Sequence, residues 1–233
     1  MISVITPTLN EGKYLEKLMK ALKAQDNQDF EVIVSDSHSD DNTADIAKKY
    51  GARVVLSERL GPGVGRNVGA KAAKGEILLF IDADTTPSPH LISKVKAMLE
   101  KRKSVIGGTC QFYPSQGNVL DWFVYAITNA AARAMIATGT PQDPGYCFFY
   151  RREVFEKLGG LRTDLSFNET HDLAMRSKQY GKFAFLKAPV FTSLRRYRKL
   201  GYLKTIKTYL GSTIYYLRTG QTPAEKFEFK PVR

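Results

Sequence analysis

The sequence predicts an α/β fold with a mostly parallel sheet, and two observations carry this prediction. Strand-like stretches at residues 2–6, 30–35 and 53–56 are each followed by a helix-like stretch. The five apolar residues Ile77–Ile81 form a run too short for a helix, which suits a strand buried on both faces. Successive β-α units joined by right-handed crossovers produce such a sheet.

In the amino-terminal half, each predicted element has a local signal. Apolar residues from Leu15 to Leu22 share one helical face, and Gly51 closes the next helix. A glycine-rich stretch at 61–67 opens the third helix, which ends at Gly75. The predicted elements are, in order, strand 2–6, turn 7–11, helix 15–22, strand 30–35, polar run 36–42, helix 43–50, strand 53–56, helix 61–74 and strand 77–81.

Beyond this half the pattern is looser. Pro87 and Pro89 are expected to stop further strand pairing, with a helix starting near Ser88. The remaining predicted features are a helix near 91–101, a strand near 105–112, an apolar segment around Trp122, a loop at 139–145 and a helix from about 152 to 159. No internal repeat or linker divides residues 2–190.

Charge and composition narrow the class of protein. The 233 residues are 43% hydrophobic and 25% charged, as in a globular domain, but the net charge is +12. That excess implies an anionic partner such as a nucleotide, a lipid phosphate, phospholipid headgroups or nucleic acid. Cys110 and Cys147 do not make a disulfide framework, so a reducing cytoplasm is expected. We expect no signal peptide, and no uncharged run reaches the ~18 residues that span a bilayer.

Two carboxylates follow the central apolar run directly. Asp82 and Asp84 are expected at the carboxyl end of a parallel strand, where ligands of open α/β sheets collect. Their charges would repel each other unless a cation or hydrogen-bond donors compensate them. A hard cation, Mg²⁺ or Mn²⁺, shared with a diphosphate, suits such a pair. The alternative is an acidic turn that caps the following helix.

Several motifs occur in an order that resembles glycosyltransferase family two, whose members have the A-type, Rossmann-like glycosyltransferase fold. They are Pro7-Thr8-Leu9-Asn10-Glu11, Asp36 with the polar run after it, Gly63-Val64-Gly65-Arg66-Asn67, Asp82-Ala83-Asp84, Gly159-Gly160-Leu161 and residues 169–176. The resemblance covers roughly residues 2–190. It implies a catalytic domain at 1–192 and leaves 193–233 as a basic, aromatic carboxy-terminal extension.

The resemblance also implies a donor site for a nucleotide-diphosphate sugar. Asp36 would accept from the N3–H of a uracil ring flanked by Thr8 and Asn10, whereas the alternative for Asp36 is a helix cap. Arg66 would meet the diphosphate. Asp82 would hold the ribose or assist the metal, and Asp84 would be the main metal ligand. The substrate-binding residues implied in this way are Pro7, Thr8, Asn10, Glu11, Asp36, Ser37, Arg66, Asn67, Asp82 and Ala83.

The downstream motif departs from the family pattern Glu-Asp-x-Asp-Leu. Thr170 replaces the aspartate that takes the acceptor proton, and threonine cannot act as a base near pH 7. The catalytic candidates are therefore Glu169 and Asp172, or no base at all. His171 could ligate the metal, shuttle a proton, or be structural. An i,i+4 ion pair between Asp172 and Arg176 is the alternative for that aspartate.

The extension combines an apolar stripe with basic and aromatic residues. The stripe is Leu203, Ile206, Leu210, Ile214 and Leu217 at helical spacing. Such a helix either lies in an anionic membrane interface or packs on the domain with a solvated basic face. The expected location is therefore the cytoplasm and, if the helix lies in the membrane interface, the inner face of the cell membrane.

Together these observations predict an inverting, metal-assisted glycosyltransferase. The donor would be a UDP-sugar and the acceptor a lipid-linked or membrane-proximal glycan, with Glu169 as base. A polyprenyl phosphate acceptor, already ionised, would need no base. A nucleotidyltransferase is the alternative among enzymes, and a non-catalytic nucleic-acid binder the alternative outside them, although no nucleic-acid partner is expected.

Overall fold

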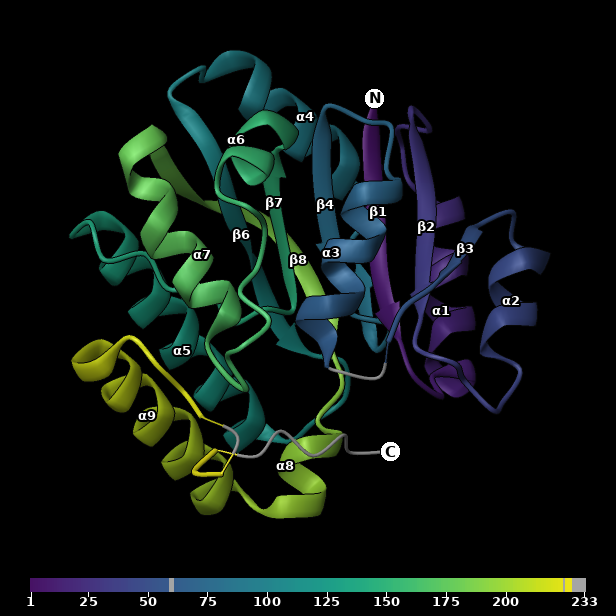
Figure 1. Ribbon diagram of the computed structural model, residues 1–233. Helices are drawn as coiled ribbons and strands as arrows, with labels where there is room; N and C mark the ends of the chain where they lie inside the picture. The colour runs from purple at the N-terminus through teal and green to yellow at the C-terminus, as the bar shows by residue number, and fades with distance from the viewer. Residues whose placement is uncertain (59–60, 224, 228–233) are drawn as a thin grey trace.

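The computed structural model describes residues 1–58, 61–223 and 225–227. Within these residues one eight-stranded sheet has the order β3-β2-β1-β4-β7-β6-β8-β5 (Figure 1). The strands are β1 (Ile2–Thr8), β2 (Phe30–Asp36), β3 (Arg53–Leu56), β4 (Ile77–Ile81), β5 (Thr85–Pro87), β6 (Val105–Pro114), β7 (Cys147–Arg151) and β8 (Lys182–Thr192). The helices are α1 (Gly12–Lys23), α2 (Thr43–Lys49), α3 (Pro62–Ala72), α4 (Leu91–Lys101), α5 (Val119–Ala137), α6 (Arg152–Lys157), α7 (Glu169–Ser177), the 3-10 turn Lys178–Tyr180, α8 (Arg195–Leu200) and α9 (Tyr202–Thr219).

The predicted α/β fold is confirmed, and its parallel part is the amino-terminal half. Strands β3, β2, β1 and β4 are mutually parallel, with Thr8 opposite Asp36 at the ends of β1 and β2. The carboxyl ends of these strands therefore meet at one edge of the sheet, as the argument for a site after β4 requires.

The other half of the sheet is mixed. Strand β7 is antiparallel to β4 and β6, β8 is parallel to β6, and β5 is antiparallel to β8. The expectation that Pro87 and Pro89 stop pairing was wrong, because Thr85–Pro87 pairs with β8. A proline fits there because β5 is an edge strand, where a missing N–H donor costs no ladder bond. The helix expected near Ser88 begins at Leu91 instead.

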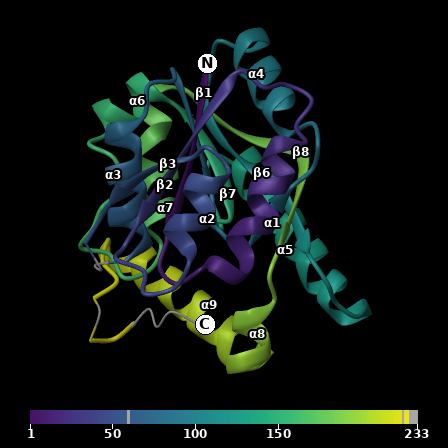
Figure 2. The same cartoon turned by 90° about the vertical axis from the view of Figure 1, so that its right-hand side faces the viewer.

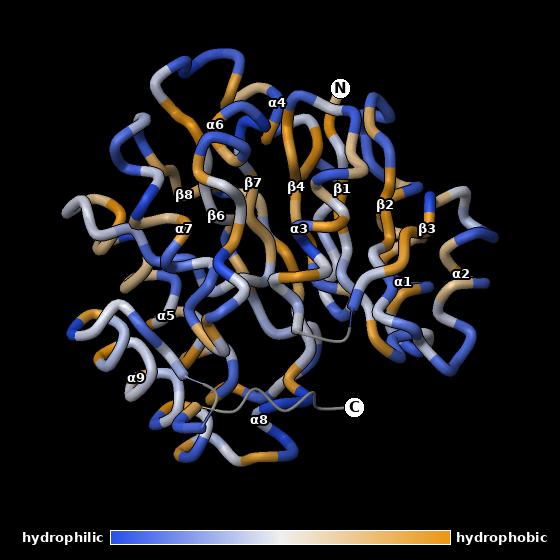
Figure 3. Tube along the Cα trace, in the orientation of Figure 1, coloured by the Kyte–Doolittle hydropathy of each residue, from blue (hydrophilic) through white to orange (hydrophobic). Residues whose placement is uncertain are grey.

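Helices cover both faces of the sheet and enclose two apolar cores. Figure 2 shows α3, α6 and α7 on one face and α1, α4 and α5 on the other. The first core joins Leu15, Leu79 and Val95, and the second joins Ala70, Phe80 and Phe155. Figure 3 shows the hydrophobic colour concentrated along the central strands. Strand β4 contributes to both cores, which is why its apolar residues are continuous rather than alternating.

The glycines of α3 have a packing role. A Cβ at position 69 would lie 2.4 Å from Ile5 Cγ2, and one at position 65 would lie 3.1 Å from Pro7 Cβ. The close backbone approach suggested by the glycine-rich stretch is thus, at these two positions, the approach of α3 to β1.

The carboxy-terminal extension forms α8 and α9; in Figure 1, α8 lies below the central strands and α9 lies at the lower left. Leu194 and Tyr197 join the first core, so the extension is anchored to the rest of the fold. Residues 224 and 228–233 of the predicted extension lie outside the described residues. Among the described helices, none is both long enough and apolar enough to cross a membrane.

Candidate active site

The candidate residues gather where β1, β2 and β4 end. Asp36 is the last residue of β2, Asp82 and Asp84 follow β4, and Glu11 follows β1. Glu169, distant in sequence, begins α7 and reaches the same region through Arg66. The topology therefore brings together five of the sequence motifs that were identified separately.

Asp36 is held in one orientation. Its Oδ1 accepts hydrogen bonds from Thr8 Oγ1 at 2.9 Å and Ser39 Oγ at 2.6 Å, and its Oδ2 accepts from the Ser39 amide at 2.9 Å. The side chain is buried. These contacts hold the carboxylate oxygens of Asp36 in place, and carboxylate oxygens are hydrogen-bond acceptors that suit a base N–H.

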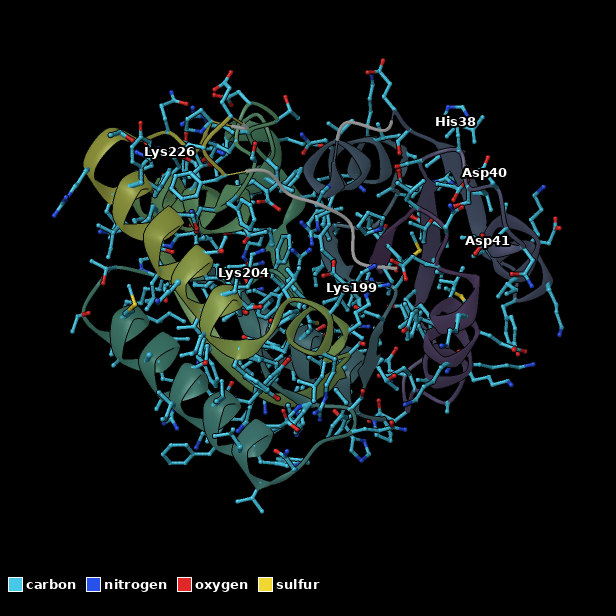
Figure 4. All side chains as sticks on the ribbon, turned by 90° about the horizontal axis from the view of Figure 1, so that it is seen from below. His38, Asp40, Asp41, Lys199, Lys204 and Lys226 are labelled. Atoms are coloured by element: carbon cyan, nitrogen blue, oxygen red, sulfur yellow. The ribbon has the colours of Figure 1, made fainter. Side chains whose placement is uncertain are left out.

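The adjoining loop is fixed by polar contacts with the end of β1. Asn10 adopts a left-handed conformation with φ of 56°, and its Oδ1 accepts from the Asp40 amide at 2.7 Å. The Ser37 hydroxyl lies 3.0 Å from that of Ser57, at the end of β3. Figure 4 shows His38, Asp40 and Asp41 of this loop on the opposite side of the sheet end from Lys199 and Lys204.

Arg66 links the two acidic motifs. The residue is 3% exposed, with Nη2 donating to Asp82 Oδ1 at 2.7 Å and Nη1 donating to Glu169 Oε1 at 2.9 Å. Nη2 also donates to the Gly145 carbonyl at 3.1 Å. Burial works to lower the pKa of Arg66, but the charges of Asp82 and Glu169 outweigh it and raise that pKa. Both terminal nitrogens of Arg66 therefore donate to protein acceptors. These contacts do not test the predicted contact between Arg66 and a diphosphate, which stays a prediction.

Asp84 and Glu11 share a second arginine, which belongs to the basic carboxy-terminal extension. Arg195, the first residue of α8, donates to both carboxylate oxygens of Glu11 at 2.6 and 2.8 Å. Its Nε lies 2.9 Å from Asp84 Oδ2. Burial, with added repulsion from Asp82 and Glu11, raises the pKa of Asp84 to about 7 despite this arginine.

The chemistry of these donors fits a hard divalent cation. Asp82 and Asp84 supply carboxylate oxygens at one strand end, with Glu11 close enough to perturb the ionisation of Asp84. The described residues hold no group of three His, Cys, Asp or Glu side chains arranged as a complete metal site. Mg²⁺ commonly takes only one or two carboxylates and completes its shell with substrate phosphates and water. Asp82 and Asp84 would therefore hold a cation together with a diphosphate.

A buried carboxyl, Asp143, stands beside this cluster and was missed in the sequence. Its Oδ1 accepts from Thr109 Oγ1 at 3.0 Å and from the Gly145 amide at 2.9 Å. Burial raises the pKa of Asp143 to about 7. Thr170, in the position of the usual base, donates its hydroxyl to the Asp143 backbone carbonyl at 2.9 Å. The Asp-Pro-Gly turn at 143–145 was the available sequence signal, but it indicates a turn rather than a site.

Asp172 accepts hydrogen bonds from residues outside the acidic cluster. Its Oδ2 accepts from Arg176 Nε at 2.6 Å, which is the expected i,i+4 contact, and its Oδ1 accepts from Tyr216 Oη of α9 at 2.8 Å. His171 is buried against the Tyr216 ring, and burial lowers its pKa. These contacts join α7 to α9.

Two more predicted residues have structural surroundings. Asn67 exchanges two hydrogen bonds with the backbone of Leu161, at 2.8 and 3.0 Å, and so ties α3 to the glycine motif at 159–161. Ala83 is buried in the first core. The contacts of Asn67 and Ala83 described here are therefore structural, and none of them is with the carboxylate cluster.

A cavity of about 230 Å³ lies beside the start of α7 and α9. Phe167, Tyr209 and Leu200 give it apolar walls, and Arg196 and Lys204 add two cations. Phe167 lies two residues before Glu169, and Arg196 follows Arg195, which contacts Asp84, so two segments that line the cavity also carry residues of the acidic cluster or their partners. A larger hollow of about 780 Å³ lies at the amino end of β2 and is remote from these carboxylates.

Known proteins share both sequence and fold with this chain. A poly(ribitol-phosphate) beta-N-acetylglucosaminyltransferase, TarS of Staphylococcus aureus, is 36% identical over 110 residues, covering 44% of this chain and 19% of its own. An uncharacterized glycosyltransferase of Haemophilus influenzae is 27% identical over 192 residues, covering 78% of this chain and 64% of its own. The chain thus spans from about a fifth to about two thirds of these relatives.

Solved structures show the same fold. A mannosyltransferase from Pyrobaculum calidifontis in complex with GDP-Man and Mn²⁺ superimposes with a TM-score of 0.72 at 21% identity, over 97% of this chain and 66% of that one. TarS 1-349 in complex with UDP-GlcNAc gives 0.64 at 23% identity, over 82% and 58%. The family profile described as Glycosyl transferase family 2 matches residues 3–159. Asp36, Asp82 and Asp84, at the ends of the parallel strands, lie within the matched residues, and Glu169 lies beyond them. The chain therefore belongs to glycosyltransferase family 2.

Proposed function

We propose that this protein transfers a sugar from a UDP-sugar to a lipid-linked or membrane-proximal acceptor with inversion at the anomeric carbon. The observation that carries the proposal is the convergence of Asp36, Asp82 and Asp84 at neighbouring strand ends, with Glu169 held beside them by Arg66. Family membership supports glycosyl transfer over the nucleotidyltransferase and nucleic-acid-binding alternatives.

Asp36 is the proposed reader of the base. Its oriented carboxylate can accept the N3–H of uracil, whereas the corresponding edge of guanine would present a different pattern of groups. The related structures were solved with UDP-GlcNAc in one case and with GDP-Man in another, so the nucleotide base differs between proteins of this fold.

A divalent cation, Mg²⁺ or Mn²⁺, is the proposed cofactor, held by Asp84 with Asp82. It would supply positive charge to offset the charge that develops on the leaving diphosphate. Manganese in complexes of two related enzymes supports this assignment. The buried Arg66 would keep Asp82 oriented, since its Nη2 donates to Asp82 Oδ1 at 2.7 Å.

Glu169 is the proposed base for a hydroxyl acceptor. The acceptor oxygen would attack the anomeric carbon as the bond to the diphosphate oxygen breaks, and Glu169 would take the hydroxyl proton. Asp172 is the weaker candidate, because Arg176 and Tyr216 occupy both of its oxygens. We therefore assign Asp172 a positioning role at the contact between α7 and α9.

A phosphate-bearing acceptor is the second candidate, and the cavity beside α9 favours it. Arg196 and Lys204 line this cavity together with Phe167 and Leu200, which combines cations with apolar walls. An ionised lipid phosphate would match both features and would need no base, consistent with Thr170 in the usual base position.

A thermal-shift panel of UDP, GDP, CDP and dTDP sugars, with and without Mn²⁺, tests the proposal. A ligand that binds only the folded protein raises the unfolding temperature by mass action. We expect UDP-sugars with Mn²⁺ to give the largest rise. Equal rises in the unfolding temperature for all nucleotides would contradict the assignment of Asp36. A rise that is the same with and without Mn²⁺ would contradict the assignment of Asp84.

A further inference from the structure

Helix α5 buries polar side chains and exposes large apolar ones, which is the reverse of a typical surface helix. Its buried residues include Asp121 and Asn129, whereas Val119, Leu120 and Phe123 are 86%, 54% and 62% exposed. Trp122 and Ile127 are also exposed. A surface helix normally buries its apolar stripe and exposes polar residues, so α5 presents an uncovered apolar face.

Helix α9 shows the same reversal. Its fully buried residues are Thr205 and Ser212, while four leucine and isoleucine side chains are at least half exposed. These are Leu203, Leu210, Ile214 and Leu217. Of the twelve large apolar side chains that are exposed among the described residues, nine lie on α5 and α9. Such concentration marks an interaction surface rather than scattered exposure.

The two helices lie on the same side of the molecule, next to the candidate active site. Figure 4 shows α5 and α9 running alongside each other, and Figure 1 places both at the lower left. Arg198 of α8 donates to Asp121 in the first turn of α5 at 2.8 Å, and Arg195 of the same short helix contacts Asp84. The amino-terminal turn of α5 is therefore joined through α8 to the acidic cluster.

The charge around this face is one-sided. Residues 195–219, which form α8 and α9, contain seven lysine or arginine residues and no aspartate or glutamate. Lys207 stands four residues after Leu203 and three before Leu210, on the same side of α9. Residues 122–142, through most of α5, contain Arg133 and no acidic residue. An uncovered apolar face with a cationic border matches an anionic lipid surface.

We propose that α5 and α9 form one docking surface for an anionic lipid bilayer. The apolar side chains would enter the headgroup boundary, where Trp122 and Phe123 are favourable, and Lys204 and Lys207 would pair with lipid phosphates. This inference adds α5 to the extension that the sequence indicated and deepens the proposed lipid-linked acceptor. The active site would then face the membrane in which such an acceptor is held.

Vesicle co-sedimentation of the full chain tests the surface, using phosphatidylglycerol–phosphatidylcholine vesicles and vesicles of phosphatidylcholine alone. We expect binding to the anionic vesicles that weakens as salt rises. The triple variant V119S/L120S/F123S should bind at least ~10-fold more weakly, because it removes exposed apolar groups without touching either core. The variant K204E/K207E should lose a similar factor on anionic vesicles.

Matched controls use the other end of the sheet. Tyr180 is 42% exposed just before β8, and Lys101 and Lys103 precede β6, so all three lie at the amino ends of strands parallel to β4. The variants Y180S and K101E/K103E should bind vesicles like the wild type. Circular dichroism and the unfolding temperature would show that every variant is folded.

The opposite outcomes are equally clear. Wild-type protein that ignores anionic vesicles at low salt would overturn the proposal, as would binding that V119S/L120S/F123S leaves unchanged. A wild-type dimer that this triple variant converts to monomer, without vesicle binding, would assign the face to a second copy instead. Vesicle binding is measured without donor, and nucleotide-sugar binding is measured without vesicles, so failure of one does not imply failure of the other.

Discussion

Arg66 Nη1 donates to Glu169 Oε1 at 2.9 Å, across 103 positions of sequence. Arg66 lies in α3 and Glu169 lies in the first turn of α7, so the contact joins the glycine-rich motif to the downstream acidic motif. The side chain of Glu169 is only 15% exposed, and it packs close to Gly63, where a Cβ would lie in ordinary contact with Glu169 Cγ at 3.5 Å. The proposed base is thereby fixed within the acidic cluster rather than free in solvent.

The first prediction concerns this residue. Glu169→Gln should lower the rate of transfer to a hydroxyl acceptor by ~10²-fold or more, because glutamine cannot take the proton. Binding of the nucleotide sugar should persist, since the amide oxygen can still accept from Arg66. Steady-state kinetics with donor affinity measured separately would check this. Glu156→Gln, at a carboxylate that is 62% exposed, is the control. Normal transfer by Glu169→Gln to a lipid phosphate would favour the mechanism without a base.

The second prediction concerns the cation. Asp84→Asn should weaken the Mn²⁺-dependent binding of the nucleotide diphosphate and reduce transfer by ~10²-fold or more, because an amide is a poor ligand for a hard cation. The fold should remain, as Arg195 Nε can donate to the amide oxygen as it does to Asp84. Calorimetric titration of UDP with and without Mn²⁺ would measure the effect. Asp45→Asn, on the exposed side of α2, serves as the control. Full activity of Asp84→Asn in excess chelator would show that the mechanism does not use the metal.

The third prediction concerns the base of the donor. Asp36→Ala removes the acceptor that Thr8 and Ser39 orient, so affinity for uridine nucleotides should fall more than affinity for guanosine nucleotides. A lost hydrogen bond to a charged group is worth about 1.5–3 kcal/mol, which corresponds to roughly 10- to 100-fold in affinity. Competition between UDP and GDP measures the difference. An equal loss for both would leave Asp36 a cap for the loop that follows β2.

Local sequence was sufficient to predict the parallel half of this fold. The apolar run Ile77–Ile81 forms a buried strand with the predicted bounds, and the helix over 91–101 is found with its predicted bounds. Both depend on side-chain pattern within one element. Strand β5 was excluded on the strength of Pro87, although its pairing with β8 depends on a segment about 100 residues later that no local pattern connects to it.

The site shows the same division between local and tertiary information. Asp36, Asp82 and Asp84 could be placed because each follows a predicted strand, and parallel strand ends meet. Arg195 and Asp143 could not, since their relation to the cluster depends on where α8 and the 143–145 turn return to the sheet. The outward apolar face of α5 was equally unpredictable, because its sequence is apolar nearly all round and only the structure shows which residues are buried.

The last prediction concerns pH and Asp143. Its folded-state pKa of about 7 exceeds the unfolded value of about 3.9, so between these values the folded chain binds more protons than the unfolded chain. The contribution of Asp143 to stability is therefore greatest below pH 4 and is lost as pH rises to about 7, by up to about 4 kcal/mol.

Asp143→Asn cannot ionise, yet its amide oxygen can accept from Thr109 and the Gly145 amide as the carboxyl does. The free energy of unfolding of this variant, measured by denaturant titration, should rise relative to wild type as pH increases from 4 to 7. Asp164→Asn, at an exposed carboxylate whose pKa Arg162 lowers, should not show that rise. A difference between Asp143→Asn and wild type that stays constant over this range would mean that Asp143 is ionised throughout it.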